Sequence, residues 1–212
     1  MKKNVLKIAL SSFAFVLALS GCGNPSPSDS SVKEPEVFVP VSYSSNGIAL
    51  DRYQIVVPRL ANATMNFAAS ELRSYLKKAT GIELKVVKDD ALEGEYEILL
   101  GECDRKETEG IDFESLGEEA YAIQTKGNDL LIEASSNRGI LYGVYSFLEA
   151  LGYRYYTPMV EKIPEAEKVF VPSEIDLSWT PVFDYRETMF QNAWDPSFAV
   201  KQKINSDFSA PS

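Results

Sequence analysis

The alternation of apolar and polar positions predicts an amphipathic helix over residues 63–80. Leu72, Tyr75 and Leu76 fall on one face of that helix, at the spacing that an apolar stripe covering a core requires. Gly81 follows directly, and glycine is the residue type that most often ends a helix. The sequence therefore predicts both this helix and the residue at which it ends.

A second helix is predicted to start at Ser135 or Ser136, either of which can cap it, and to stop at Gly152. Its broad apolar stripe is formed by Ile140, Leu141, Val144, Tyr145, Leu148 and Leu151. Gly139 and Gly143 lie four residues apart inside it, where each lowers helix propensity. We infer that their missing side chains let the helix lie close to a neighbour, the sheet.

Strands are predicted where apolar residues alternate with polar ones or form a short run. The segments of this kind are residues 53–58, 82–86, 95–101, 153–156 and 168–171. Residues 119–126 and 129–134 flank a Gly-Asn turn and predict a β-hairpin. Residues 102–119 are polar and acidic, which is typical of an excursion at the surface.

The order of these elements predicts an α+β domain, with two main helices packed on one face of a mixed β-sheet. Strict alternation of strand and helix is absent, and no glycine-rich phosphate loop follows a strand. A doubly wound dinucleotide-binding fold is therefore disfavoured, and no cofactor is expected.

Composition removes several classes of function. The 212 residues include no histidine, which excludes a Ser-His-Asp triad and an H-E-x-x-H zinc site built from this chain alone. Two cysteines cannot form a four-thiolate zinc site, and no metal is expected. The net charge of −10 opposes a broad surface for nucleic acid, so we expect no nucleic-acid partner.

The first 46 residues are predicted to direct and anchor the protein. Residues 1–21 combine early lysines with a short apolar run, as a secretory signal peptide does. The run ends in Leu-Ser-Gly before Cys22, which resembles the lipobox of bacterial lipoproteins, so lipidation of Cys22 is expected. Residues 22–46 follow as the lipidated cysteine and a flexible linker. The predicted location is the bacterial cell envelope, lipid-anchored to the membrane, on its periplasmic or its surface-exposed side.

The stretch of residues 134–158, ASSNRGILYGVYSFLEALGYRYYTP, carries a family resemblance. It resembles the last helix and following strand of the non-catalytic N-terminal domain shared by family 67 α-glucuronidases and family 20 β-N-acetylhexosaminidases. The helix of residues 68–81 and the strand ending at 99–101 are similar to earlier landmarks of that domain. The resemblance implies an α+β accessory domain over residues 47–178, like the second domain of hexosaminidases.

The family resemblance is made more specific by residues 179–188 and 192–196. They are similar to the entry into the catalytic barrel of the lipoproteins that share domain of unknown function 4838. A (β/α)₈ barrel needs roughly 200 residues or more, so residues 179–212 hold only an incomplete first barrel unit. Residues 190–212 are expected to lack a stable fold, because the barrel would supply their neighbours.

Candidate chemistry is sparse. Arg186 and Glu187 interrupt residues 182–190, which resemble the first barrel strand, and in the hexosaminidase relatives an arginine on this strand grips sugar hydroxyls. The resemblance thus implies substrate binding by these two residues, whereas a structural ion pair of Arg186 with Glu187 or Asp184 explains the arginine equally well. The acidic clusters, Glu118 with Glu119 among them, are expected to be solvated, and no catalytic residue is assigned.

The leading hypothesis is a lipid-anchored, non-catalytic N-terminal domain of a glycoside-hydrolase-like protein involved in polysaccharide breakdown. Its partners are a catalytic barrel domain or carbohydrate, and the membrane through the anchor. By itself the chain is expected to be inactive, whereas full-length relatives resemble hydrolases of the α-glucuronidase and hexosaminidase type. Two alternatives stay open, namely a surface glycan-binding lipoprotein and a structural interaction module.

Overall fold

A computed structural model describes residues 49–206 of the chain, so the predicted signal peptide, Cys22 and the whole linker lie outside the described residues. The main sheet has six strands in the order β2-β1-β3-β5-β4-β8. These strands are β1 (Gln54–Val57), β2 (Lys85–Lys88), β3 (Glu97–Leu100), β4 (Tyr121–Lys126), β5 (Asp129–Glu133) and β8 (Asp176–Trp179). The first three and β5 run parallel, whereas β4 pairs antiparallel with β5 and β8. The sheet is therefore mixed, as predicted.

Both long helices are capped; Gly81 after the first and a serine before the second were predicted, whereas Asn62 before the first was not. Helix α1 (Ala63–Thr80) begins where the Asn62 side chain accepts a hydrogen bond from the Met65 N–H, and Gly81 ends it with φ 77°. Helix α2 (Asn137–Ala150) begins where Ser136 accepts from the Gly139 N–H, which settles the choice between the two serines.

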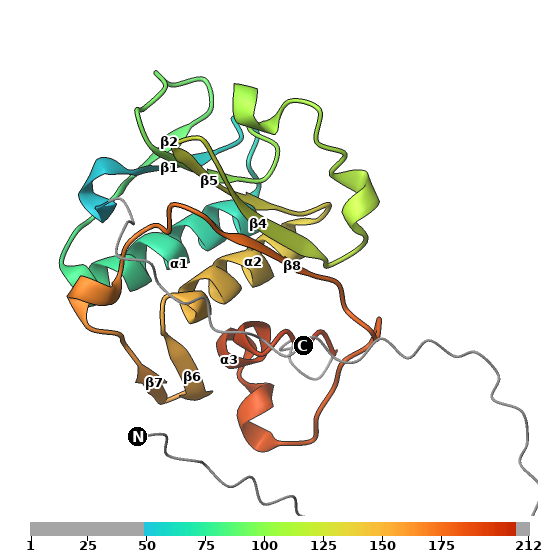
Figure 1. The fold of residues 1–212 in the computed structure, drawn as a ribbon. Helices are drawn as coiled ribbons and strands as arrows, with labels where there is room; N and C mark the ends of the chain where they lie inside the picture. The colour runs from blue at the N-terminus through green and yellow to red at the C-terminus, as the bar shows by residue number, and fades with distance from the viewer. Residues whose placement is uncertain (1–48, 207–212) are drawn as a thin grey trace, which may run out of the picture. The chain divides into compact units, whose positions relative to one another are not determined.

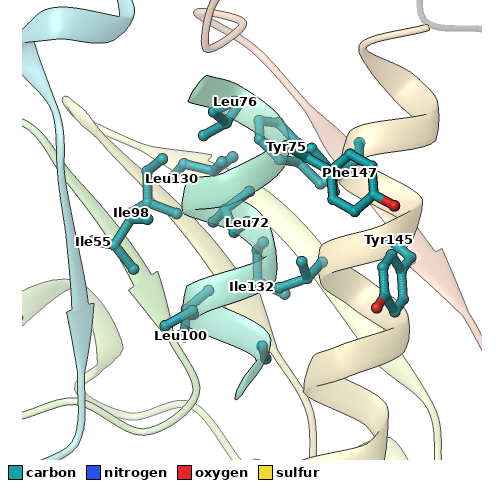
Figure 2. Packing of buried hydrophobic residues seen from close by; sticks show 14 of the residues in the cluster. Ile55, Leu72, Tyr75, Leu76, Ile98, Leu100, Leu130, Ile132, Tyr145 and Phe147 are labelled. Atoms are coloured by element: carbon teal, nitrogen blue, oxygen red, sulfur yellow. The ribbon is translucent and has the colours of Figure 1, made fainter. Parts of the chain in front are cut away.

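Both helices lie on the same side of the sheet (Figure 1), and contacts link α1 to β1 and α2 to β4 and β5. Figure 2 shows the apolar layer between them, in which Leu72 and Phe147 from the helices meet Ile98 and Ile132 from the strands. Each of these four side chains is buried. Two helices on one face of a mixed sheet confirm the predicted α+β class.

Gly139 and Gly143 bring α2 against the sheet, as inferred. A Cβ atom on Gly143 would lie 2.6 Å from Cγ2 of Ile132, and one on Gly139 would lie 2.6 Å from the Ala120 carbonyl oxygen. Neither distance is compatible with a side chain, so glycine is required for this close approach.

The opposite face of the sheet is covered by residues 101–120, as Figure 1 shows. Val56, Leu99 and Leu131 from three adjacent strands form a small buried cluster with Cys103 from this excursion. The excursion is therefore more than a surface loop, because it closes the second face of the sheet. Burial raises the pKa of the Cys103 thiol to about 12, so Cys103 is an apolar packing residue.

The remaining elements are short. Strands β6 (Arg154–Thr157) and β7 (Val160–Lys162) form a separate two-stranded sheet. The 3₁₀ turns are Leu50–Arg52, Lys106–Thr108, Glu114–Leu116, Ala166–Lys168 and Gln191–Trp194, and α3 spans Pro196–Lys201. No helix between residues 49 and 206 has both the length and the apolar character that a bilayer crossing needs.

The strand predictions need correction in several places. The second strand lies at Lys85–Lys88 instead of 82–86. Residues 168–171 bury Val169 and Val171 without forming a regular strand, and a 3₁₀ turn, Ala166–Lys168, ends where this segment begins. Strands β7 and β8 were not predicted, and β8 runs across the expected boundary between residues 178 and 179.

The expected barrel strand over residues 182–190 is absent from the described structure, in which this segment has no regular secondary structure. The following residues are more ordered than predicted, because α3 buries Phe198 and Ala199 and contacts α2 and β6. Up to Ser206, the tail therefore packs on the accessory domain.

Candidate functional site

Arg186 lies where the C-terminal segment meets the domain, and protein atoms accept from all three of its guanidinium nitrogens. Its Nε donates to the Lys203 carbonyl oxygen at 2.7 Å, its Nη1 to the Phe183 carbonyl oxygen at 2.7 Å, and its Nη2 to the Glu119 carboxylate. Its backbone N–H also donates to Oδ1 of Asn205, at 2.7 Å. This network fixes Arg186 between two stretches of the same segment and the edge of the sheet.

Glu119 is the centre of this arrangement. It directly precedes Ala120 and β4, has a φ of 63°, and is only 8% exposed. Its Oε1 accepts from Arg138 Nη1 at 3.0 Å, and its Oε2 accepts from Asn205 Nδ2 at 2.9 Å as well as from Arg186. We call Glu119, Arg138, Arg186 and Asn205 the Glu119 cluster.

The charge of Glu119 is stabilised by this cluster. Burial acts to raise the pKa of its carboxyl group, but the hydrogen bonds from Arg186 and Arg138 outweigh it and hold the pKa below its usual range. The expectation that Glu119 is solvated was wrong. A carboxylate paired with two guanidinium groups serves as an anchor and is not available as a proton donor.

Aromatic rings support Arg186 from the domain side. Its guanidinium carbon lies 5.4 Å from the ring centroid of Trp179 and 5.8 Å from that of Tyr142, within the range of cation–π attraction. Trp179 in turn stacks on Tyr121 with centroids 5.6 Å apart. The strand β8, the helix α2 and the C-terminal segment are therefore joined at one point.

Glu187, the second predicted sugar-binding residue, is placed differently. It is exposed, and its Oε2 accepts a hydrogen bond from the Tyr185 hydroxyl at 2.5 Å. Arg186 is directed to the Glu119 cluster, so the described structure does not bring the two predicted residues together in one site. Sugar binding by Arg186 and Glu187 stays a prediction.

A second attachment holds α3. The Nζ of Lys201 donates to the Tyr75 hydroxyl at 2.7 Å, and it lies 5.1 Å from the ring centroid of Tyr155 and 5.8 Å from that of Tyr145. The side chain of Gln202 donates to the Tyr155 carbonyl oxygen at 3.1 Å. The C-terminal segment is thus fixed to the domain on both sides of residues 187–200.

Between these attachments and just before them, the chain exposes large apolar side chains. They are Val182 at 84% exposure, Phe183 at 70%, Tyr185 at 57%, Met189 at 73%, Phe190 at 61% and Trp194 at 50%. We call residues 182–194 the apolar segment. Large apolar groups held in solvent by a fixed backbone are typical of a surface that meets another protein surface.

Among residues 49–206, no group of three or more His, Cys, Asp or Glu side chains is placed so that it could hold a metal ion. Sequence reasoning missed the Glu119 cluster, since Glu119 meets Arg186 67 positions further along the chain and Asn205 86 positions further along. No local pattern marks such a contact.

Comparisons with known proteins agree with the landmarks in the sequence. Residues 44–147 match the family described as "Glycosyl hydrolase family 67 N-terminus". A comparison with curated proteins found no match.

Among solved structures, similar chains include a Flavobacterium johnsoniae chitobiase, with TM-score 0.49 and 16% identity over 77% of this chain. Others are a mutant Streptomyces plicatus beta-hexosaminidase, with TM-score 0.43 and 16% identity over 66%, and a family GH115 4-O-methyl-alpha-glucuronidase, with TM-score 0.44 and 14% identity over 63%. This chain covers 24%, 24% and 18% of the length of these three proteins, respectively. Over residues 44–147 the chain thus resembles the N-terminal domain of glycosyl hydrolase family 67, as its sequence predicted.

Proposed function

We propose that this chain is a lipid-anchored, non-catalytic N-terminal domain that holds the catalytic domain of a glycoside-hydrolase-type protein. The observation that carries the proposal is the apolar segment, which the Glu119 cluster and Lys201 fix to the accessory domain. The family match over residues 44–147 supports the choice of partner, because it is a match to the N-terminal part of a glycosyl hydrolase.

A non-catalytic role is supported by the state of the buried carboxylates. Glycoside hydrolysis uses two carboxyl groups about 5–10 Å apart that both reach the substrate. Glu97 and Asp129 are neighbours, since the Glu97 N–H donates to Asp129 Oδ1 at 2.7 Å. They are only 0% and 8% exposed, and Arg105 donates to both oxygens of Glu97 at 2.6 and 3.3 Å. A sugar cannot reach this pair.

An activity assay tests that role. We expect the chain alone to release no product from aryl glycosides or glucuronoxylan fragments. Turnover that is abolished by Glu102→Gln or Glu114→Gln, the accessible carboxylates of one pocket, or by Glu119→Gln or Asp129→Asn, in a variant that still folds, would contradict the proposal.

Docking is tested with a recombinant family 67 catalytic domain whose own N-terminal domain has been removed. Sedimentation velocity is expected to show a complex with this chain, since both partners then present apolar surface that the other can cover. The triple variant Phe183→Ser, Phe190→Ser, Trp194→Ser is expected to lose the complex and to keep its fold, because these side chains are exposed.

The matched control replaces exposed apolar residues elsewhere. Leu92 and Met159 are 92% and 91% exposed and lie outside the apolar segment, so Leu92→Ser with Met159→Ser removes a similar kind of surface. This double variant is expected to keep the complex. Equal loss in both variants, or no complex with the unaltered chain, would contradict docking through the apolar segment.

The anchor is proposed from the lipobox-like sequence before Cys22 and the polar linker after it. Removal of residues 1–21 takes away three lysines and changes the formal charge from −10 to −13. Mass spectrometry of the N-terminal peptide from bacterial membranes is expected to find acyl chains on Cys22, and Cys22→Ser is expected to lose them. An unmodified Cys22 in the membrane fraction would contradict the anchor.

A further inference from the structure

The accessory domain has a pocket of about 360 Å³ at one edge of its sheet. Pro58, Gly101 and Ala134 line it, and each directly follows the last residue of a parallel strand, β1, β3 or β5 respectively. These three strands are neighbours in the sheet. The pocket therefore lies at the carboxyl ends of adjacent parallel strands, where open α/β sheets commonly bind ligands.

The pocket forms because the chain leaves these strands in different directions. After β1 it enters α1, after β5 it enters α2, and after β3 it begins the excursion of residues 101–120. Met65 and Ile140 from the helices line one side. Gly101 has φ 74°, and a Cβ atom there would lie 3.0 Å from the Met65 Cε and 3.5 Å from the Ile140 Cδ1. Glycine at this position keeps that side of the pocket clear.

Polar groups without a partner line the rest. The side chains of Glu102, Glu114 and Asn137 make no hydrogen bond or ion pair with any described residue. Ser135 and Ser136 are engaged, since the former donates to the Gly117 carbonyl oxygen and the latter caps α2. The pocket thus offers two carboxylates and one amide that are free to bind a ligand.

The lining selects a class of ligand. None of the residues around this pocket is basic, and two are acidic, so an anionic ligand is repelled. Carboxylates and an amide accept hydrogen bonds from hydroxyl groups, and the half-buried ring of Phe113 offers an apolar face. The volume falls within the range of small-molecule sites, about 300–1,000 Å³.

We propose that this pocket binds a neutral sugar residue of a polysaccharide. Glu102, Glu114 and Asn137 accept hydrogen bonds from its hydroxyls, and Phe113 packs against its C–H face. The choice of a polysaccharide sugar as the hydroxyl-bearing ligand rests on the proposed function, whereas the pocket shares no residue with the apolar segment and is tested separately from docking.

Calorimetric titration of the full chain in detergent micelles tests the proposal. The probes are the neutral trisaccharides xylotriose, cellotriose and mannotriose, together with trigalacturonate as an acidic counterpart of similar size. We expect saturable binding of at least one neutral probe, and binding of trigalacturonate that is at least about tenfold weaker because two carboxylates face it.

Variants locate the binding. Phe113→Ala and Glu102→Ala are each expected to weaken binding of the neutral probe about tenfold, since each removes one contact of about 1.4 kcal/mol. Glu118→Ala is the matched control, because Glu118 is an exposed acid of the same excursion that does not line the pocket. A circular dichroism spectrum checks that each variant folds.

Three results would overturn the proposal. They are no binding of any neutral probe, tighter binding of trigalacturonate, and an affinity that Phe113→Ala and Glu102→Ala leave unchanged. The docking experiment with the family 67 catalytic domain is independent of all three, so failure of one proposal is distinguishable from failure of the other.

Discussion

Two buried charge clusters hold the described residues together, and their compositions are opposite. In the first, two carboxylates lie beside a single guanidinium group, since Arg105 pairs with Glu97 and Asp129 accepts a hydrogen bond from the Glu97 backbone N–H. In the second, the single carboxylate of Glu119 is shared by Arg138 and Arg186. The first cluster therefore has a spare negative charge and the second a spare positive one.

The clusters also differ in what they connect. The side chains of Arg105 and Glu97 are 5% and 1% exposed, and they join β3 to the excursion that covers the sheet. The side chains of Arg186 and Glu119 are 18% and 10% exposed, and they join the domain to the C-terminal segment. From this difference we expect the first cluster to govern the stability of the whole domain and the second to govern the position of the apolar segment.

The largest effect is expected from Arg105→Met. Glu97 would then be a buried carboxylate without its cation, and breaking a buried pair in this way costs about 3–5 kcal/mol of the free energy of unfolding. Urea denaturation monitored by circular dichroism measures the loss. A cost below about 1 kcal/mol would show that water reaches Glu97 and that the first cluster does not govern global stability.

A smaller and more local effect is expected from Glu119→Ala. It removes the acceptor shared by Arg186, Arg138 and Asn205, and should lower the free energy of unfolding by about 2 kcal/mol. Hydrogen exchange should quicken at residues 186–205 and stay slow in β3 and β5. If exchange quickened equally in those strands, the proposed division of roles between the clusters would be wrong.

Asp129→Asn is expected to change the pH dependence of stability in the first cluster. Burial raises the pKa of Asp129 to about 6, above its ordinary value of 3.8, so the protonated form stabilises the fold. That stability is fully present below pH about 4 and is lost as the pH rises through about 6. Asparagine keeps an oxygen that can accept from the Glu97 N–H but carries no charge. The free energy of unfolding of the variant, relative to that of the unaltered chain, should therefore be higher at pH 7.5 than at pH 4.5 by on the order of 1 kcal/mol.

Glu119 should respond with the opposite sign. Its pKa is lowered, so the stability from its ion pairs is present above the unfolded pKa and is lost as the pH falls through the folded pKa. The loss of stability caused by Glu119→Ala should therefore shrink in acid. The gain of stability caused by Asp129→Asn should also shrink there, because Asp129 is already neutral. Denaturation of both variants at several pH values checks this pair of trends, and a Glu119→Ala effect that grows in acid would contradict it.

The smallest effect is expected from Arg138→Ala. The Arg138 side chain is 54% exposed, and Glu119 keeps its bond from Arg186. The variant should therefore lower the free energy of unfolding by about 0.5 kcal/mol or less. Arg186→Ala is the comparison variant, and it should cost more, because Arg186 is only 18% exposed. Equal costs would mean that the two arginines are interchangeable partners of Glu119.

The parts of the fold that the sequence predicted are those with local signals. Helix α1 ends at Gly81, and α2 lies between Ser136 and Gly152. The β4–β5 hairpin turns at Gly127, whose φ is 60°. In each case a capping or turn residue sits directly beside an apolar pattern, so neighbours in the sequence are sufficient.

The parts that were not predicted depend on distant partners. Strand β8 is four residues long at the edge of the sheet, and only its pairing with β4 makes it a strand. Leu84 is buried although it precedes β2, which shifted the expected strand towards it. The Glu119 cluster joins residues 67 and 86 positions apart, and its acidic sequence context is the same as that of solvated carboxylates.

Hydrogen–deuterium exchange of this chain, with and without a family 67 catalytic domain that lacks its own N-terminal domain, tests the central claim most directly. We predict that the added domain slows exchange at residues 182–194 and leaves β1, β3 and β5 unchanged. Unchanged exchange in the apolar segment, with slowing elsewhere on the accessory domain, would contradict the claim that this segment is the docking surface.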